Sequence, residues 1–159
     1  MKKGFTLIEL LVVISIIGIL AAMATISFSG TQKQARDTAR KSDLAQYRTS
    51  LEMFANKNGG LYPYYSAPTT ASDTLCTKLG LGTCPEDPKY ASDATYPQYK
   101  YQSDGAGIAG SASATKYVLW AKLENATNMY WVVCSTGQSG KITSSTTFAG
   151  GVCPSGMTQ

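Results

Sequence analysis

The feature that most limits how this chain can fold is an apolar run of 24 residues, from Phe5 to Phe28. Its only charged side chain is that of Glu9. A helix rises about 1.5 Å per residue, so a helix of this length reaches roughly 36 Å. The hydrocarbon core of a bilayer is about 30 Å thick. The run therefore predicts a membrane-spanning helix over residues 5–30.

Two lysines, Lys2 and Lys3, precede the apolar run. Positive charges favour a cytoplasmic location for the flanking end of a spanning helix, which places the chain after Gly30 outside. A cleavable secretory signal peptide is the rival interpretation, because Ala22-Met23-Ala24 imitates an A-x-A cleavage site. Glu9 argues against it, since a cleavable apolar region has no reason to carry a carboxylate near its start.

The string GFTLIE at residues 4–9 follows a short basic leader and precedes the apolar run over residues 10–24. This arrangement resembles the class III signal of type IV pilins and type II secretion pseudopilins. The resemblance implies that a prepilin peptidase removes the leader, residues 1–4, by cutting after Gly4. It also implies methylation of the new N-terminus, Phe5, and a role for Glu9 in subunit assembly.

A carboxylate within a bilayer costs about 2.5 to 3.5 kcal/mol by insertion scales, so Glu9 is expected to have a partner. After the implied cleavage, Phe5 of a neighbouring, staggered subunit would offer a positively charged amine. Glu9 can instead meet its own N-terminal amides, because an acid is favoured in a first helical turn. A third alternative is a tolerated acid that reaches headgroup water. The residues alone leave these alternatives open.

The helix is expected to continue as an amphipathic half over residues 31–58. Apolar residues recur there at spacings of three and four, which places them on one stripe: Leu44, Tyr47, Leu51 and Phe54. Asn58-Gly59-Gly60 is a helix end signal. Asp37 lies four residues before Lys41, which predicts a surface ion pair, and the basic run over residues 33–41 is expected to be a solvated face.

Residues 59–159 are expected to form a globular head. Residues 61–95 predict an ordered loop with at most one short helical turn, near residues 71–79. Strands are expected over four ranges, with the middle two as a hairpin and residues 103–115 as a surface connection: 98–103, 116–123, 129–135 and 141–148. The fold class is therefore α+β, a long helix packed on a small antiparallel meander, as in the type IV pilin fold that the resemblance implies.

Four cysteines lie in the head: Cys76, Cys84, Cys134 and Cys153. Zinc sites favour close pairs such as C-x2-C, which are absent. An exported head meets oxidising conditions, and sequential pairing is the expected one of three connectivities. Free structural thiols are the alternative. A link from Cys134 to Cys153 would resemble the disulfide-bounded loop of many pilins.

Charge and composition argue against other function classes. The chain has no histidine, which removes the commonest general base and metal ligand, so neither an enzyme nor a cofactor is expected. From Gly60 onward six bases balance six acids, so nucleic-acid binding is not expected either. Asp87, Asp93 and Asp104 lack the D-x-D-x-D-G calcium spacing and are expected to be solvated loop carboxylates.

By resemblance, the expected function is that of a structural subunit of a type IV pilus, an extracellular filament for adhesion, motility or DNA uptake. The implied partners are further copies of the chain in a helical homo-oligomer, the membrane before assembly, the prepilin peptidase, and a platform protein with a motor ATPase. The precursor would lie in the cytoplasmic membrane and the pilus on the bacterial surface. The alternative is a pseudopilin of a type II secretion system, in a short periplasmic pseudopilus.

Overall fold

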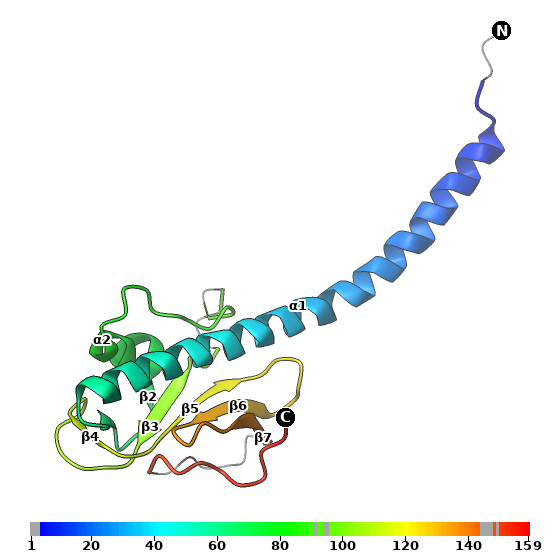
Figure 1. The fold of residues 1–159 in the computed structure, drawn as a ribbon. Coiled ribbons are helices and arrows are strands. Elements are labelled where there is room, and N and C mark those ends of the chain that lie inside the picture. The colour runs from blue at the N-terminus through cyan, green and yellow to red at the C-terminus, as the bar shows by residue number, and fades with distance from the viewer. Residues whose placement is uncertain (1–3, 91, 94–95, 144–147, 149) are drawn as a thin grey trace.

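The computed structural model describes residues 4–90, 92–93, 96–143, 148 and 150–159. One long helix, α1 (Leu7–Lys57), dominates the shape, and its second half lies along the head while its first half projects away from it (Figure 1). The helix bends gently along its length, as long helices usually do. It is long and apolar enough to cross a membrane.

The two ends of α1 follow from local sequence. The helix begins at Leu7 rather than at Phe5, because Thr6 has extended backbone angles and acts as the N-cap. At the other end the backbone N–H of Gly60 donates to the carbonyl of Ala55 at 2.8 Å. Gly59 and Gly60 have φ of +66° and +85°, which glycine adopts without strain. The helix therefore ends at the Asn58-Gly59-Gly60 signal, as predicted.

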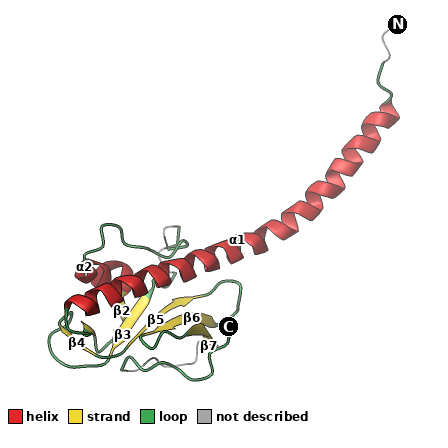
Figure 2. Ribbon diagram, in the orientation of Figure 1, coloured by secondary structure: helices red, strands yellow, loops and turns green. Residues whose placement is uncertain are grey.

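The head contains two antiparallel sheets (Figure 2). The larger has five strands in spatial order: β2 (Thr69–Thr70), β3 (Lys100–Ser103), β5 (Tyr117–Lys122), β6 (Met129–Cys134) and β7 (Ser139–Thr143). The smaller pairs β1 (Tyr62–Pro63) with β4 (Ala112–Ala114). A π-helical turn, η1 (Ala71–Leu75), runs directly into the short helix α2 (Cys76–Leu79). The α+β fold class, the β5–β6 hairpin and the helical turn over residues 71–79 are confirmed.

Three predictions about strands need correction. Residues 61–95, expected to be a loop with at most one helical turn, also contain β1 and β2. Residues 103–115 are more than a surface connection, because they include β4, which pairs with β1. Elements of two and three residues are too short to show an alternating pattern. The strand predicted over residues 141–148 begins earlier, at Ser139, and ends at Thr143 in the described chain. Residues 144–147 lie outside the described residues.

The second half of α1 packs on one face of the larger sheet. Leu44, Tyr47 and Leu51 are completely buried there, and Ala55 continues the stripe. Phe54, predicted to be its fourth member, is only half-buried. The helical repeat of 3.6 residues brings Ala55 rather than Phe54 back to the same line after Leu51.

Side chains of the sheet alternate between two cores. One core includes Tyr101, Leu119 and Val133, which share it with α1. The opposite face of the sheet carries a second core, and its buried residues are Val118, Trp120, Val132, Cys134, Ile142 and Phe148. The central strand β5 is therefore buried on both faces.

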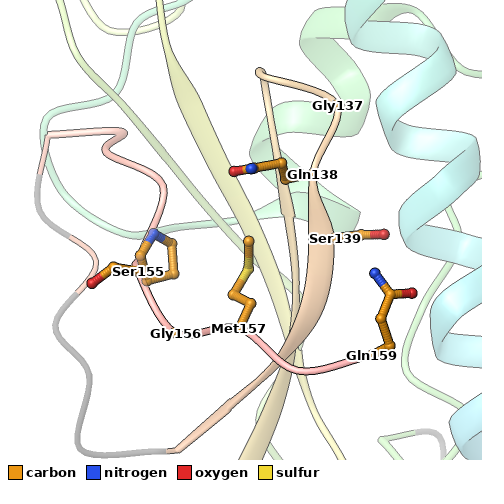
Figure 3. Close-up of a pocket in the computed structure, with 8 residues that line it drawn as sticks. Gly137, Gln138, Ser139, Ser155, Gly156, Met157 and Gln159 are labelled. Carbon is orange, nitrogen blue, oxygen red and sulfur yellow. The ribbon is translucent and has the colours of Figure 1, made fainter.

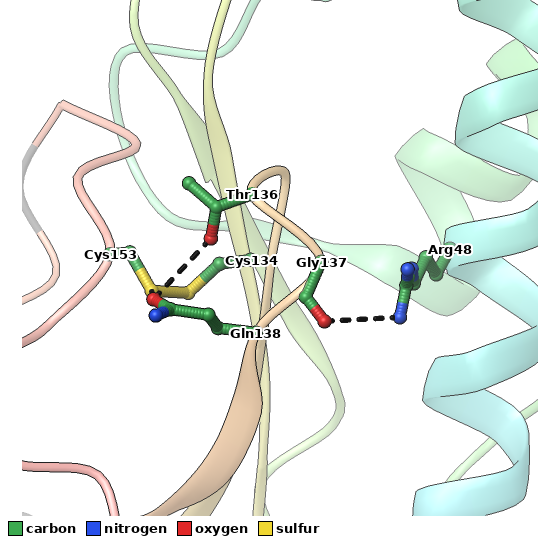
Figure 4. Close-up of a disulfide and its surroundings, with 6 residues drawn as sticks. All are labelled: Arg48, Cys134, Thr136, Gly137, Gln138 and Cys153. Carbon is green, nitrogen blue, oxygen red and sulfur yellow. Dashed lines mark hydrogen bonds between the residues drawn. A yellow bond between two sulfur atoms is a disulfide. The ribbon is translucent and has the colours of Figure 1, made fainter.

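Residues 150–159 form part of the second core. Met157 packs against it, and Lys141 and Thr158 exchange backbone hydrogen bonds of 2.7 and 3.0 Å. The disulfide between Cys134 and Cys153 ties the segment to β6 (Figure 4). The other disulfide joins Cys76 to Cys84, so the structure pairs the cysteines in sequential order.

Replacing Leu51 with alanine is expected to lower the free energy of unfolding by about 2 to 5 kcal/mol, because it opens a cavity between α1 and the sheet. Denaturant unfolding of the full chain in detergent, followed by tryptophan fluorescence, measures this. Met53→Ala on the same helix is the matched control, since Met53 is 56% exposed. Equal losses for the two variants would contradict the proposed packing.

Candidate functional site

The residues singled out in the N-terminal signal lie together at the free end of α1. Gly4 and Phe5 precede the helix and have no regular secondary structure. Phe5 is 80% exposed. A side chain built at Gly4 would meet nothing within 4 Å. The peptide bond between these two residues therefore lies in an open, non-helical stretch.

Glu9 forms a reciprocal capping box with Thr6. Its backbone N–H donates to Thr6 Oγ1 at 3.3 Å. In return, Oε2 of Glu9 accepts hydrogen bonds from the Thr6 backbone N–H at 2.8 Å and from the Thr6 hydroxyl at 2.7 Å. This arrangement satisfies donors that a helix start otherwise leaves open. Of the alternatives for Glu9, the single chain adopts the pairing with its own first turn.

The first half of α1 is apolar on every side that the structure describes. Residues 4–23 and 28–35 are all exposed. Leu7 and Ile8 expose 88% and 70% of their surface. A helix that is apolar all round belongs in a bilayer or among other apolar helices. This half of α1 therefore requires a cover that the head does not supply.

A cavity of about 370 Å³ lies in the head, between the β6–β7 turn and residues 154–159 (Figure 3). Its lining is mainly small and polar: Gly137, Gln138, Ser139, Pro154, Ser155, Gly156, Met157 and Gln159. None of these described residues has an ionisable side chain. The side chains of this lining therefore include no general acid or base.

A buried network of charges lies where α1 leaves the head. We call it the anchor cluster, and its members are Arg36, Asp37, Arg40, Asp87 and Glu124. The Arg40 side chain is fully buried and donates to Asp87 through Nε at 2.7 Å and Nη2 at 2.9 Å. It also donates to Glu124 at 2.6 Å and to Asp37 at 2.7 Å.

The remaining contacts of the anchor cluster are made by Arg36 and Asp37. Arg36 forms a two-pronged pair with Glu124, with distances of 2.8 and 2.7 Å. Asp37 accepts the backbone N–H groups of Glu124 and Asn125, both at 2.9 Å. Asp37 thereby binds the β5–β6 turn to α1.

Several predictions about charged residues were wrong. Asp37 pairs with Arg40 rather than with Lys41. The amine of Lys41 lies 4.4 Å from the centre of the Trp131 ring. The basic run is therefore not simply a solvated face, and the contacts that replace solvent come from residues far along the chain.

Of the three head aspartates, Asp87 is not solvated, whereas Asp104 is partly exposed and accepts hydrogen bonds from the chain. Asp87 is buried in the anchor cluster. Asp104 accepts the backbone N–H groups of Thr115 and Lys116, each at 2.7 Å. Spacing in the sequence shows no sign of either pairing, because the partners are joined only by the fold.

The anchor cluster shifts the pKa values of Glu124 and Arg40. Hydrogen bonds from Arg36, reinforced by Arg40, lower the pKa of Glu124 to about 2. Burial alone would lower the pKa of Arg40, but its hydrogen bonds to Asp87, Glu124 and Asp37 outweigh burial and raise that pKa. The charged forms of Glu124 and Arg40 are therefore stabilised by their partners in the anchor cluster.

The first 25 residues match the family model described as a prokaryotic N-terminal methylation motif. The chain is 42% identical over 60 residues to prepilin peptidase-dependent protein D of Escherichia coli (strain K12), a match that covers 38% of this chain and 41% of that protein. It is 30% identical over 107 residues to type IV major fimbrial protein FimA of Dichelobacter nodosus, covering 60% and 67%.

The chain is also 30% identical over 96 residues to type II secretion system core protein G of Aeromonas hydrophila, covering 55% of this chain and 67% of that protein. It thus spans about two fifths of the first of these three relatives and two thirds of the other two. No solved structure is significantly similar to the chain.

The free energy of unfolding is expected to fall as the pH decreases from about 5 to 2. The folded-state pKa of Glu124 is about 2, against an ordinary value of 4.5. A lowered carboxyl pKa stabilises the fold above the unfolded value, and this contribution disappears as the pH falls through the folded value. At about 1.4 kcal/mol per pKa unit, the loss is on the order of 3 kcal/mol.

Denaturant unfolding at a series of pH values measures this loss. Glu124→Gln is expected to start less stable and to give a shallower pH dependence, because the titrating group is gone while Arg36 and Arg40 remain. Asp73→Asn, an exposed carboxylate of η1, is the control and should keep the steep dependence. Parallel curves for the wild type and Glu124→Gln would assign the pH dependence to other groups.

Proposed function

The chain belongs to the family of type IV pilins and type II secretion pseudopilins, and we propose on this premise that it is a subunit of a type IV pilus. It is a pilin-like structural subunit rather than an enzyme. In the proposal residues 1–4 are the leader, residues 5–30 the membrane and polymerisation helix, and residues 31–58 its amphipathic half. Residues 59–159 form the head, which faces the outside of the cell.

The observation that carries the proposal is the uncovered apolar half of α1, with one carboxylate near its free end. In the membrane, lipid covers this surface before assembly. Helix association then gains little from the hydrophobic effect, because lipid tails are as apolar as leucine, so packing and polar pairing decide it. Glu9 is the only charged group on the described helix before Lys33. It is therefore the group that would form a polar pair between helices of different subunits.

Processing would change the partner of Glu9. In the single chain its carboxylate is held by Thr6. Removal of residues 1–4 by a prepilin peptidase would expose the amine of Phe5, and methylation leaves this amine positively charged. In a staggered filament the amine of one subunit would meet Glu9 of the next. Two charges that are costly in an apolar environment would then form one pair.

The geometry of the cleavage site supports this processing. Proteases act on extended substrate segments, and Gly4 and Phe5 lie outside the helix in an exposed stretch. Export of further copies and their addition to a filament would require a membrane platform and a cytoplasmic motor ATPase. These partners are part of the proposal.

The alternative function is that of a pseudopilin of a type II secretion system. The similarity to core protein G over 55% of the chain favours it. The similarity to the fimbrial protein over 60% of the chain supports the pilus in the same way.

Mass spectrometry of fibres sheared from cells is expected to show a chain that begins at Phe5 and carries a methyl group on its amine. Electron microscopy of the same material should show long surface filaments. Short periplasmic assemblies would support the pseudopilin instead. A subunit that retains Met1, or one cut behind Ala24, would contradict both functions.

Glu9→Gln is expected to reduce fibre yield at least tenfold while the amount of precursor in the membrane stays unchanged. The substitution keeps the shape of the side chain but removes the charge that would meet the Phe5 amine. Immunoblots of sheared fibres and of membranes measure the two quantities. Asp73→Asn removes an equal charge from the exposed surface of the head and should leave fibre yield unaltered.

A further inference from the structure

We propose that the anchor cluster is a positioning element for filament assembly, because it fixes the direction in which the first half of α1 leaves the head. This inference rests on the proposed function, since direction matters only if the helices of different subunits must meet in register. It assigns an assembly role to five charged residues that lie far from the apolar surface itself.

Among the side chains that the structure describes, the anchor cluster contains the last buried residues of α1 on the way to its N-terminus. Toward the N-terminus, Leu44 is the final buried apolar residue of the helix and Asp37 the final buried residue of any kind among the described side chains. Arg40 lies between them and is fully buried. Residues 4–23 and 28–35 are exposed. The contacts of residues 36–40 therefore determine the direction in which the first half of α1 projects from the head.

Three separate parts of the chain meet at this point. α1 provides Arg36, Asp37 and Arg40, the loop before β3 provides Asp87, and the turn after β5 provides Glu124. The ring of Tyr96, from the same loop as Asp87, lies 4.9 Å from the Arg40 guanidinium carbon. The helix is thus held from both the loop and the sheet.

The chemistry of these contacts is directional. Apolar contacts such as those of Leu44 and Leu51 oppose the separation of α1 from the sheet. They are not directional, however, so they allow the helix to rotate about its axis or to shift along the sheet by small amounts. An arginine that donates two parallel hydrogen bonds to a carboxylate fixes both distance and angle. Arg36 with Glu124 and Arg40 with Asp87 are two such pairs, one helical turn apart. Two pairs at this spacing define an axis.

The length of the free helix magnifies any error in that axis. About 27 residues separate Glu9 from Arg36, which is roughly 40 Å of helix. A tilt of about 10° at the anchor cluster would displace Glu9 by roughly 7 Å. A hydrogen-bonded ion pair requires donor and acceptor within about 3 Å. A small loss of direction in the head would therefore separate Glu9 from its partner in the next subunit.

The experiment uses the full chain with three substitutions. Arg36→Gln removes the outer pair, and Arg36 is exposed enough (30%) for the head to keep its fold. Arg40→Lys retains the buried positive charge but loses the two-pronged geometry. Lys33→Gln is the matched control, because it removes one positive charge from the exposed part of the same helix.

Two quantities are measured for each variant. The first is fibre yield from cells, relative to the amount of processed subunit in the membrane. The second is the distribution of distances between spin labels at Leu20→Cys on α1 and Thr74→Cys in the head, in purified protein in detergent. Denaturant unfolding of each variant identifies any that lose the folded head.

Arg36→Gln and Arg40→Lys are expected to broaden the distance distribution and to lower fibre yield at least tenfold, although peptidase cleavage continues. Lys33→Gln should match the wild type in both quantities. Unchanged fibre yield with a broadened distribution would overturn the inference, and so would lost fibres with an unchanged distribution. If Arg40→Lys unfolds, Arg36→Gln alone decides between these outcomes.

Failure of the proposed function has a different signature. Wild-type cells would then yield processed or unprocessed subunit but no fibres. In that case the distance distributions still decide the physical part of the inference. An unchanged distribution in Arg36→Gln would refute the claim that the anchor cluster fixes the helix direction.

Discussion

The rest of the structure depends on one constraint, which is that half of a 51-residue helix has an apolar surface that the described part of the head leaves exposed. Water cannot solvate such a surface at low cost, so lipid or other helices must enclose it. The head then has to be a domain that is stable without that half of α1. Its two cores, on opposite faces of one five-stranded sheet, meet this requirement by burying β5 on both sides.

The two halves of α1 therefore follow different rules. The outer half is mainly apolar and carries one charged side chain, that of Glu9, at its start, where Thr6 and Glu9 satisfy each other. The inner half is amphipathic and changes from apolar to ionic contacts between Leu44 and Arg40. Apolar packing provides most of the stability of the head. The ionic contacts instead specify the position and direction of α1 on the head. Buried charge pairs suit this role when each charge has a hydrogen-bonded partner.

The sequence predicted what depends on local pattern. The long helix, its end at Asn58, the β5–β6 hairpin and the α+β class all follow from periodicity and turn chemistry, and the structure has each of them. The pairing of β1 with β4 and the anchor cluster could not be predicted. The first involves elements too short to show a period, and the second joins residues 36–40 to residues 87 and 124. Such partners are brought together only by the tertiary fold, and nearby Lys41 was therefore the wrong partner to assign to Asp37.

Phe148, Cys153 and Met157, which belong to the second core, have a consequence for biosynthesis. The ribosome makes the sheet before these residues, so Val118 and Trp120 lack part of their cover until they emerge. Cys134 likewise waits for Cys153. A chain made only as far as β7 would expose this apolar face of the sheet together with the unpaired thiol of Cys134. Closure of the disulfide to Cys153 thus fixes the last part of the chain to the sheet by a covalent bond.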